Sequence, residues 1–401
     1  MTVHRFLSAV LFAAFFSSLV LADDTGWLHY GRDAGGARFS PLTQISADNV
    51  NDLELAWSYR HGDLKKFPER AAFAGFHATP ILLPEAAGGS LVACTPFSRA
   101  FALDPTTGQE RWSYDPGIEL SPVATRLKCL GLAYWEDPKA ESDAQCRHRL
   151  IWGTHDRRIV AVDAIYGTPC KDFGSDGEVD VNPLIEAAAV SQPDPAGTTF
   201  SAPPVVVNGV IVIGHINNMK NQYPDAPAGI IRAFDARDGA LRWEFDPIPR
   251  DRSQPHAVDW TDEAMKITGG ANAWPPMSAD PERDLVFIPT AGPGPNFYGG
   301  TRPGDNRWAN SVVALKIQSG EIAWGFQAVH HDVWDWDIPA APIVADIPVN
   351  GERVPALIVL TKQSLVFVLH RDTGEPVFEV EERPVPTGGV EGEHLSPTQP
   401  F

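Results

Sequence analysis

The residues between positions 330 and 337 form the densest group of chemically capable side chains in the sequence. This stretch reads HHDVWDWD and places Asp332, Asp335 and Asp337 within six residues. Carboxylates held close together repel one another, which raises the pKa of one of them and suits it to accept a proton as a general base. Aspartates between strands also cap turns, and this interpretation fits Asp332 equally well. The stretch therefore predicts a proton-accepting site that uses at least one of these aspartates.

Motifs for several other common chemistries are absent from the sequence. No GxGxxG follows a predicted strand and opens a helix, so a nicotinamide cofactor on a doubly wound α/β domain is not expected. His330 and His331 form the one adjacent histidine pair, and the absence of HExxH argues against a zinc hydrolase. The absence of GxSxG argues against a serine nucleophile on an elbow turn.

The charge balance limits the partners of the chain. Its 401 residues include 51 acidic and 32 basic side chains, which gives a formal net charge of -19. Nucleic acids and anionic membrane surfaces need basic patches, so neither is expected as the main partner. The hydrophobic content of 43% is enough to bury a substantial core and argues against disorder.

The N-terminus has the layout of a cleaved signal peptide. A weakly basic start precedes an apolar run over residues 6–21, and Ala22 comes directly before Asp23. We expect residues 1–22 to be removed and residues 23–401 to form the mature domain. An uncleaved membrane anchor is the alternative, although it needs about 20 apolar residues. Export also predicts disulfides among Cys94, Cys129, Cys146 and Cys170. Their pairing stays open, and Cys129–Cys146, which closes the shortest loop, is the first hypothesis.

Five internal repeats dominate the rest of the chain. Each copy has an apolar strand, a polar turn that contains glycine, and in most copies an aromatic second strand. The copies begin at Phe101, Val160, Arg232, Val313 and Phe367, and their glycines are Gly108, Gly167, Gly239, Gly320 and Gly374. Further strands are expected within 202–213, 284–289 and 355–360. Because amphipathic helices are scarce, the repeats predict an all-β fold, a β-propeller of four-stranded blades, with a large β-sandwich as the weaker alternative.

Several motifs together resemble the PQQ-dependent (quinoprotein) dehydrogenases. The N-terminal Trp27-x3-Gly31-Arg32 segment, the repeat tryptophans, GGTRPGDNRWANS from Gly299, and HHDVWDWDIPA from His330 carry the resemblance over nearly the whole mature chain. The last of these, with the later Thr-Lys-Gln at 361–363, is most similar to the glucose and quinate dehydrogenase branch, and the four cysteines are similarly placed. The resemblance implies that the tryptophans pack between neighbouring blades.

The chain departs from that family in three respects. The glucose enzymes carry N-terminal membrane helices, whereas a signal peptide is expected here. Arg126 stands where the glucose enzyme has a histidine, which argues against glucose itself as the substrate. Such propellers have eight blades, whereas about five are recognisable here, so we expect the chain to be truncated at its C-terminus.

The resemblance implies a role for each candidate site residue. Asp335 aligns with the catalytic base, and Lys362 with the cation that contacts the quinone oxygens and stabilises the charge that develops there. Asn272 aligns with the asparagine ligand of the metal, and Asp335 would contribute to the same site. A second protein ligand falls near 215–218, where Asn217 and Asn218 are weaker candidates. Amide and carboxylate oxygens suit Ca²⁺ or Mg²⁺. An acid at the position of Asp337 occurs in a lanthanide-using branch and in glucose enzymes, so no lanthanide is inferred.

The cofactor is planar and carries three carboxylates, so it should stack on an indole and meet cations and hydroxyls at its edge. Trp274 is the predicted stacking residue, and Trp260 is the second candidate for the same role. Arg99, Thr154 and Ser201 lie at strand ends that resemble carboxylate-binding positions.

The resemblance as a whole implies a periplasmic dehydrogenase that oxidises an alcohol, polyol or sugar hydroxyl and passes electrons to a membrane quinone or a cytochrome. Two alternatives remain open: a non-catalytic propeller that binds proteins, and an inactive truncated remnant of the enzyme.

Overall fold

Short antiparallel strands make up most of the regular structure in the computed structural model. The structure describes residues 26–120, 126–188, 190, 197–217, 220–223 and 226–401, so the predicted signal peptide and Asn218 lie outside the described residues. Among these residues, three short α-helices interrupt the strands: α1 (Asp63–Lys66), α2 (Asn182–Ala187) and α3 (Asp262–Ile267).

The strands form successive sheets in which neighbours in sequence are neighbours in space. Four sheets have four strands each: β1 (Ile81–Leu82), β2 (Leu91–Cys94), β3 (Ala100–Leu103) and β4 (Glu110–Tyr114); β5 (Ala133–Glu136), β6 (His148–Gly153), β7 (Arg158–Asp163) and β8 (Glu178–Asp180); β9 (Val205–Val207), β10 (Val210–Ile213), β11 (Ile231–Asp235) and β12 (Leu241–Phe245); β13 (Ser278–Asp280), β14 (Leu285–Pro289), β15 (Ser311–Lys316) and β16 (Ile322–Gln327). A three-stranded sheet of β17 (Ile343–Val349), β18 (Glu352–Leu360) and β19 (Val366–His370) follows, and then the hairpin of β20 (Glu382–Pro384) and β21 (Thr398–Pro400).

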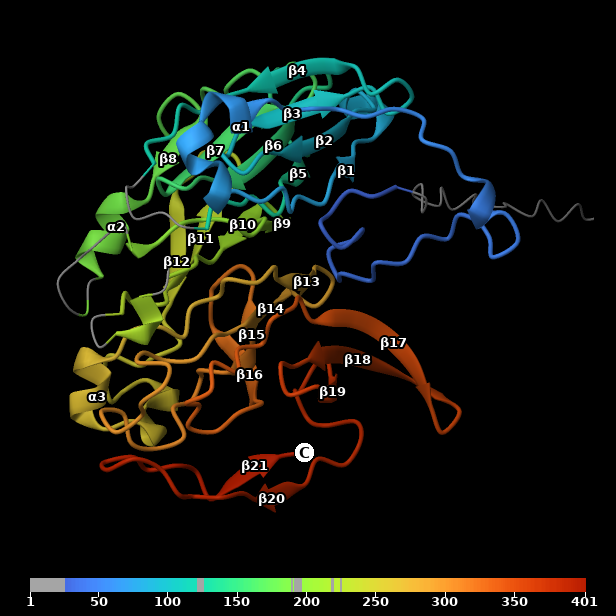
Figure 1. The fold of residues 1–401 in the computed structure, drawn as a ribbon. Coiled ribbons are helices and arrows are strands. Elements are labelled where there is room, and N and C mark those ends of the chain that lie inside the picture. The colour runs from blue at the N-terminus through green and yellow to red at the C-terminus, as the bar shows by residue number, and fades with distance from the viewer. Residues whose placement is uncertain (1–25, 121–125, 189, 191–196, 218–219, 224–225) are drawn as a thin grey trace, which may run out of the picture.

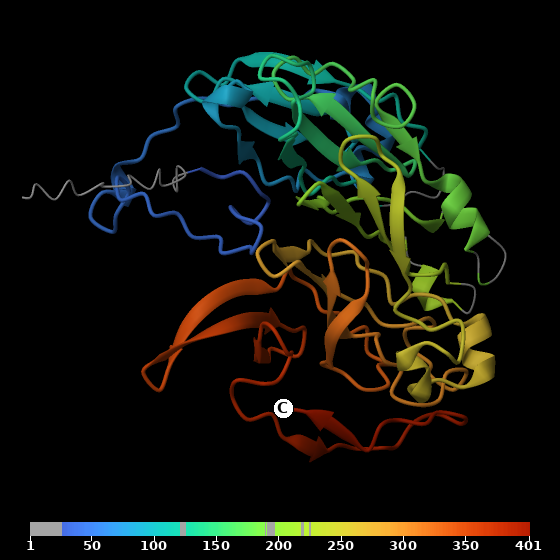
Figure 2. The same cartoon turned by 180° about the vertical axis from the view of Figure 1, so that it is seen from behind.

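The sheets follow one another in an arc from β1–β4 to β20–β21, and both views place β13–β16 between β9–β12 and β17–β19 (Figures 1 and 2). The predicted β-propeller of about five recognisable blades is confirmed as four complete four-stranded sheets and a fifth sheet with three strands. The fifth sheet lacks the fourth strand that the last repeat copy predicts. The first strand of this copy is β19, but its second half pairs only through an isolated bridge between Leu369 and Pro376.

The hydrophobic core lies between neighbouring sheets. In β10, Val210 and Val212 pack with residues of β13–β16, whereas Ile211 and Ile213 pack with residues of β5–β8. Successive side chains of a strand point to opposite faces, so a strand that is covered on both faces must be apolar throughout. This explains why β10 reads VIVI without polar alternation.

The repeat tryptophans join adjacent blades, as the resemblance implies. A Cβ atom added at Gly320 would lie 2.6 Å from Trp243, which comes from the preceding sheet and donates its indole N–H to the Ile317 carbonyl at 2.8 Å. The same close approach is found for the pairs Gly108–Trp57, Gly167–Trp112 and Gly374–Trp324, and the indole N–H of Trp324 also donates to a carbonyl of the next repeat, that of Arg371 at 3.0 Å. Gly239 instead faces Val179 and Phe173, because the second repeat copy has no tryptophan.

The disulfides correct one expectation. Cys94 pairs with Cys129, and Cys146 pairs with Cys170, so the Cys129–Cys146 hypothesis is wrong. Loop length was a poor guide because the sheets decide which cysteines meet. Cys146 and Cys170 flank the β6–β7 hairpin, where the Cys170 N–H bonds back to Ala161. Cys94 ends β2 and meets the segment that leads into β5.

Candidate active site

One face of the arc collects the connections that carry the predicted site residues. In an antiparallel sheet the second and fourth strands run in the same direction, so both end on the same side of the sheet. The connection from the second strand to the third, and the connection from the fourth strand to the next sheet, therefore begin on that side. Asp335 lies in the β16–β17 connection, Lys362 in β18–β19, and Asn272 and Trp274 in β12–β13. Polar side chains that are far apart in sequence therefore meet above the apolar core.

These four residues line one cavity of about 250 Å³. Asp337, Asn217 and Asn296 line it as well, together with Arg126 and Lys128 from the β4–β5 connection. The remaining lining residues are Ile216, Asn221 and Gln222.

Lys362 joins the two carboxylates of the cavity. Its Nζ donates to the Asp335 carbonyl at 2.6 Å and lies 3.3 Å from Asp335 Oδ2 and 3.1 Å from Asp337 Oδ2. Burial by itself lowers the pKa of Lys362, but the negative charges of Asp337 and Asp335 outweigh that effect and leave the pKa raised. The ammonium is therefore held in its charged form beside both acids.

Asp337 is the deeper of the two acids, with 6% of its surface exposed. Its Oδ1 accepts the Gly292 N–H at 2.8 Å, and its Oδ2 accepts the indole N–H of Trp274 at 3.0 Å. Burial raises the pKa of Asp337, and the nearby charge of Asp335 raises it further, while Lys362 opposes both. Asp337 thus orients the predicted stacking residue and the lysine together.

Asp335 is the accessible acid, with 42% of its side chain exposed. Its Oδ1 accepts the side-chain N–H of Asn296 at 2.7 Å. The backbone of Asp335 is left-handed, with φ +62°. Asp332 stabilises this turn, because its buried carboxylate accepts the N–H groups of Trp334 at 3.0 Å and Trp336 at 2.9 Å. Burial raises the pKa of Asp332 to about 6. The expectation that Asp332 caps a turn is confirmed.

Amide oxygens complete the polar lining. Asn272 donates its side-chain N–H to the His215 carbonyl at 2.8 Å, and its Oδ1 accepts one hydrogen bond from Asn221 at 2.9 Å. The Oδ1 atoms of Asn217 and Asn296 are buried and accept no hydrogen bond from the described residues. A buried oxygen without a donor is costly, and a cation would satisfy it.

The chemistry of these donors fits a hard divalent cation. Carboxylate and amide oxygens are the ligands that Ca²⁺ and Mg²⁺ prefer. Within the part of the chain that the structure describes, no group of three or more His, Cys, Asp or Glu side chains is placed to hold a metal ion. A cation in this cavity would therefore depend on Asn217, Asn272 or Asn296 in addition to Asp335.

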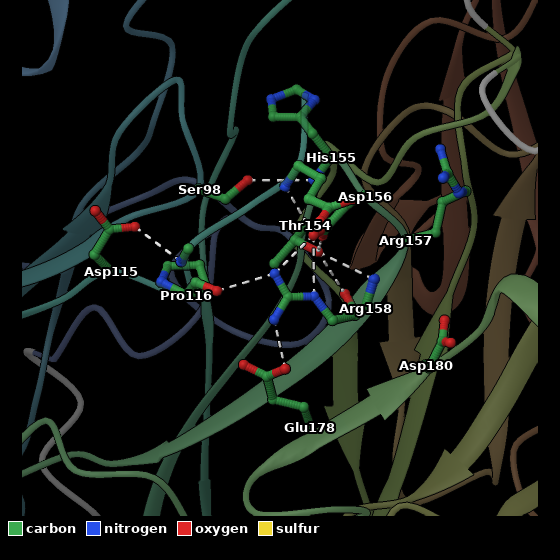
Figure 3. A network of polar contacts seen from close by, with 12 residues as sticks. Ser98, Asp115, Pro116, Thr154, His155, Asp156, Arg157, Arg158, Glu178 and Asp180 are labelled. Atoms are coloured by element: carbon green, nitrogen blue, oxygen red, sulfur yellow. Dashed lines mark hydrogen bonds and ion pairs between the residues drawn. The ribbon is translucent and has the colours of Figure 1, made fainter. Parts of the chain in front are cut away.

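Three predicted cofactor residues lie outside the lining of this cavity. Arg99 lies in the β2–β3 connection and pairs with Asp63 at 3.1 Å. Thr154, after β6, donates its hydroxyl to Asp156 within a network that includes Arg158 and Glu178 (Figure 3). Ser201 is buried just before β9. All three residues lie in connections that begin on the same side of the sheets as those of the cavity residues. Their cofactor-binding roles stay predictions.

The second candidate for stacking lies outside the lining of the cavity. Trp260 packs with the α3 segment and donates its indole N–H to the Arg307 carbonyl. In contrast, Asn296 and Asn221 were missed. Asn296 lies in the β14–β15 connection, which has the same topological position as the β18–β19 connection of Lys362. That position in the repeat was the signal that could have found it.

A family model described as the PQQ-type glucose/ethanol/alcohol dehydrogenase β-propeller domain matches residues 27–401. The chain belongs to this family. The quinoprotein dehydrogenase propeller therefore accounts for the repeat copies, the inter-blade tryptophans and the grouping of Asn272, Asp335 and Lys362 at one edge.

Relatives from several bacteria are similar over the same span. Quinoprotein glucose dehydrogenase of Escherichia coli is 37% identical, over 94% of this chain and 46% of that protein. Quinate/shikimate dehydrogenase (quinone) of Acinetobacter baylyi is 33% identical, over 93% of this chain and 46% of that protein. The crystal structure of quinohemoprotein alcohol dehydrogenase from Comamonas testosteroni has a TM-score of 0.72 at 26% identity, and the match covers 95% of this chain and 52% of that one. The chain thus spans about half the length of the relatives it matches.

Proposed function

We propose that this chain is the propeller of a PQQ- and metal-dependent dehydrogenase that oxidises a CH–OH group of a small alcohol, polyol or sugar. The observation that carries the proposal is the convergence of Asp335, Lys362, Asn272 and Trp274 on one cavity. The family relationship supports the same cofactor class. The names of similar proteins specify glucose, glycerol, quinate or shikimate, and alcohol as substrates.

The cofactor, when bound, supplies a two-electron acceptor for the hydride that leaves the substrate carbon. Asp335 is placed to take the hydroxyl proton, because it is the carboxylate that reaches the accessible part of the cavity. Lys362 is placed to donate to an oxygen on which negative charge develops. Trp274 offers an indole face whose orientation is held by its hydrogen bond to Asp337.

The divalent cation would be held by Asn272 and Asp335, with Asn217 or Asn296 contributing a further amide oxygen. Its chemistry there would be that of a Lewis acid that polarises an acceptor oxygen. Calcium and magnesium both fit the donor set. The cofactor-edge roles of Arg99, Thr154 and Ser201 and the ligand role of Asn218 belong to the same proposal.

We further propose export to the periplasm with removal of residues 1–22, and electron transfer to a membrane quinone or a cytochrome. Among the described residues, no helix is both long enough and apolar enough to cross a bilayer.

The test compares the wild-type protein with Asp335→Asn in the presence of PQQ and Ca²⁺. We expect both to bind PQQ, measured by quenching of tryptophan fluorescence, and we expect dye-coupled oxidation of a polyol panel to fall by about 10²- to 10⁴-fold in the variant. Asp176→Asn, at an exposed position on the β7–β8 connection, is the matched control. A folded wild-type protein that binds no PQQ would overturn the proposal and favour a non-catalytic propeller. Binding without turnover in the wild type would indicate an inactive remnant.

A further inference from the structure

A buried ion pair anchors the segment that carries the candidate base. Nε2 of His331 is 2.8 Å from Oε1 of Glu393, and the two side chains are 0% and 4% exposed. His331 lies in the β16–β17 connection, which also carries Asp335, whereas Glu393 lies in the β20–β21 connection. Because Glu393 lies outside the lining of the candidate active-site cavity, it can influence the chemistry there only through other residues.

The same carboxylate reaches a second segment of the site. Oε2 of Glu393 accepts the N–H of Gly299 at 2.8 Å, and Gly299 belongs to the β14–β15 connection that also carries Asn296. A Cβ atom added at Gly299 would clash with Nε2 of His331 and lie 2.8 Å from Oε1 of Glu393, so the connections meet at a contact for which only glycine leaves room. Glu393 therefore links the two segments whose side chains, Asn296 and Asp335, meet in the cavity at 2.7 Å.

The hydrogen-bond pattern fixes the charge of the pair. Nδ1 of His331 is 2.7 Å from the Gly304 carbonyl, so both ring nitrogens face acceptors, and both hydrogen bonds form only when the imidazole carries two protons. Burial alone would raise the pKa of Glu393, but the hydrogen bonds that its carboxylate accepts outweigh this effect and leave the pKa lowered. Arg302 is a further buried cation near this carboxylate, and its guanidinium donates to the Asp332 carbonyl at 2.6 Å. Loss of the negative charge at position 393 would leave a buried imidazolium without its partner.

We propose that Glu393 is a positioning residue for the proton-accepting step. Through its two hydrogen bonds it holds the β14–β15 and β16–β17 connections together, and so keeps Asp335 in contact with Asn296. The inference rests on the proposed function, because it takes Asp335 as the base. The side chain of Asp335 is 42% exposed and stands on a left-handed backbone, so its direction depends on the contacts of the turn around it. A reacting group displaced by about 1 Å can lose roughly 10²-fold in rate.

Hydrogen exchange in the cofactor-free protein tests the positioning contact without any turnover. Glu393→Gln removes the charge and turns an NH₂ group toward one of the two donors, so at least one of the two hydrogen bonds is lost. We expect the amides of 296–302 and 331–337 to exchange about 10-fold faster in this variant, while strands β5–β8 keep their wild-type rates. Glu391→Gln, at an exposed position in the same connection, is the matched control and should leave both segments unchanged.

Kinetics of the protein loaded with PQQ and Ca²⁺ test the consequence for the base. We expect Glu393→Gln to lower kcat for polyol oxidation by roughly 10- to 100-fold. KM and the affinity for PQQ should change by less than about 3-fold, because Glu393 does not line the cavity. His331→Gln should have the same effect, and the double variant should lose no more than either single variant, because the two residues act as one unit.

Three results would overturn the inference while leaving the proposed function intact. They are unchanged exchange in both segments, a loss of kcat that is matched by an equal loss of PQQ affinity, and additive losses in the double variant. If Glu393→Gln does not fold, Glu393→Asp, which keeps the charge but withdraws it by one methylene, replaces it in both measurements. Absence of PQQ binding and of turnover in the wild type would instead refute the proposed function, and this failure is recognised before any variant is compared.

Discussion

Replacing Gly320 by alanine tests whether tryptophan docking holds neighbouring blades together. The new Cβ would lie 2.6 Å from Cδ2 of Trp243, whereas carbon atoms in ordinary contact are about 3.5–4.0 Å apart. The indole must therefore move by about 1 Å, and overpacking of this kind costs about 1–3 kcal/mol. Gly320 also has φ +74°, and a left-handed alanine costs about 1–2 kcal/mol. We expect Gly320→Ala to lower the free energy of unfolding by roughly 2–5 kcal/mol.

Gly351→Ala separates the two contributions. Gly351 has φ +88° in the β17–β18 turn, and an added Cβ there would meet no atom within 4 Å. This control should therefore lose only the backbone contribution, about 1–2 kcal/mol. Both variants can be unfolded in urea while far-ultraviolet circular dichroism is followed, because all 12 tryptophans of the chain contribute to its fluorescence. Equal losses in the two variants would refute the view that the Trp243 contact stabilises the junction between β9–β12 and β13–β16.

Three further predictions concern the charged cluster and the disulfides. Lys362→Gln should lower the free energy of unfolding by about 1–3 kcal/mol, because Asp337 keeps a buried charge without its cation, and adding Asp337→Asn should restore much of the loss in a double-mutant cycle. The pKa of Asp332 is raised from 3.8 to about 6, so the folded state binds its proton more tightly than the unfolded state does, and stability falls as pH rises through this window. Relative to Asp332→Asn, the wild type should lose about 3 kcal/mol between these pH values, and a pH-independent difference in urea unfolding would contradict the assignment. Peptide mapping under non-reducing conditions should recover the Cys94–Cys129 link, and removing it with Cys94→Ser/Cys129→Ser should cost about 4 kcal/mol in thermal or urea unfolding, provided the variant folds.

The topology explains how residues more than 200 positions apart reach one cavity. Lys128 lies in the β4–β5 connection and Lys362 in the β18–β19 connection, yet both connections begin on the same side of their sheets and both residues line the cavity. This follows from the alternation of strand direction in every sheet. Once the repeats are recognised, the order of the strands along the chain predicts which connections carry site residues. They are the connections between the second and third strands of a sheet and those between successive sheets.

The local features of this protein could be predicted from its amino-acid sequence alone. The recurring turn glycines and the apolar strands around them predicted the hairpins, because turn chemistry and period-2 side-chain direction act over a few residues. The segment 330–337 and the residues around Asn272 and Lys362 identified the main candidates for chemistry through their resemblance to a family. These three segments were also the ones that the fold brought together.

Features that depend on which segments become neighbours could be read only from the folded chain. Cys129 meets Cys94 and not Cys146, because the sheet places the end of β2 beside the segment before β5. The hydrogen bond from Asn296 to Asp335 and the packing of Trp260 with the α3 segment, outside the cavity lining, likewise arise from contacts between distant segments. The pKa of Asp332 is raised because the folded chain removes its carboxylate from water. The burial of a side chain, the pairing of cysteines and the charges near an acid all arise from contacts between distant segments. Only the packing of the blades specifies these contacts.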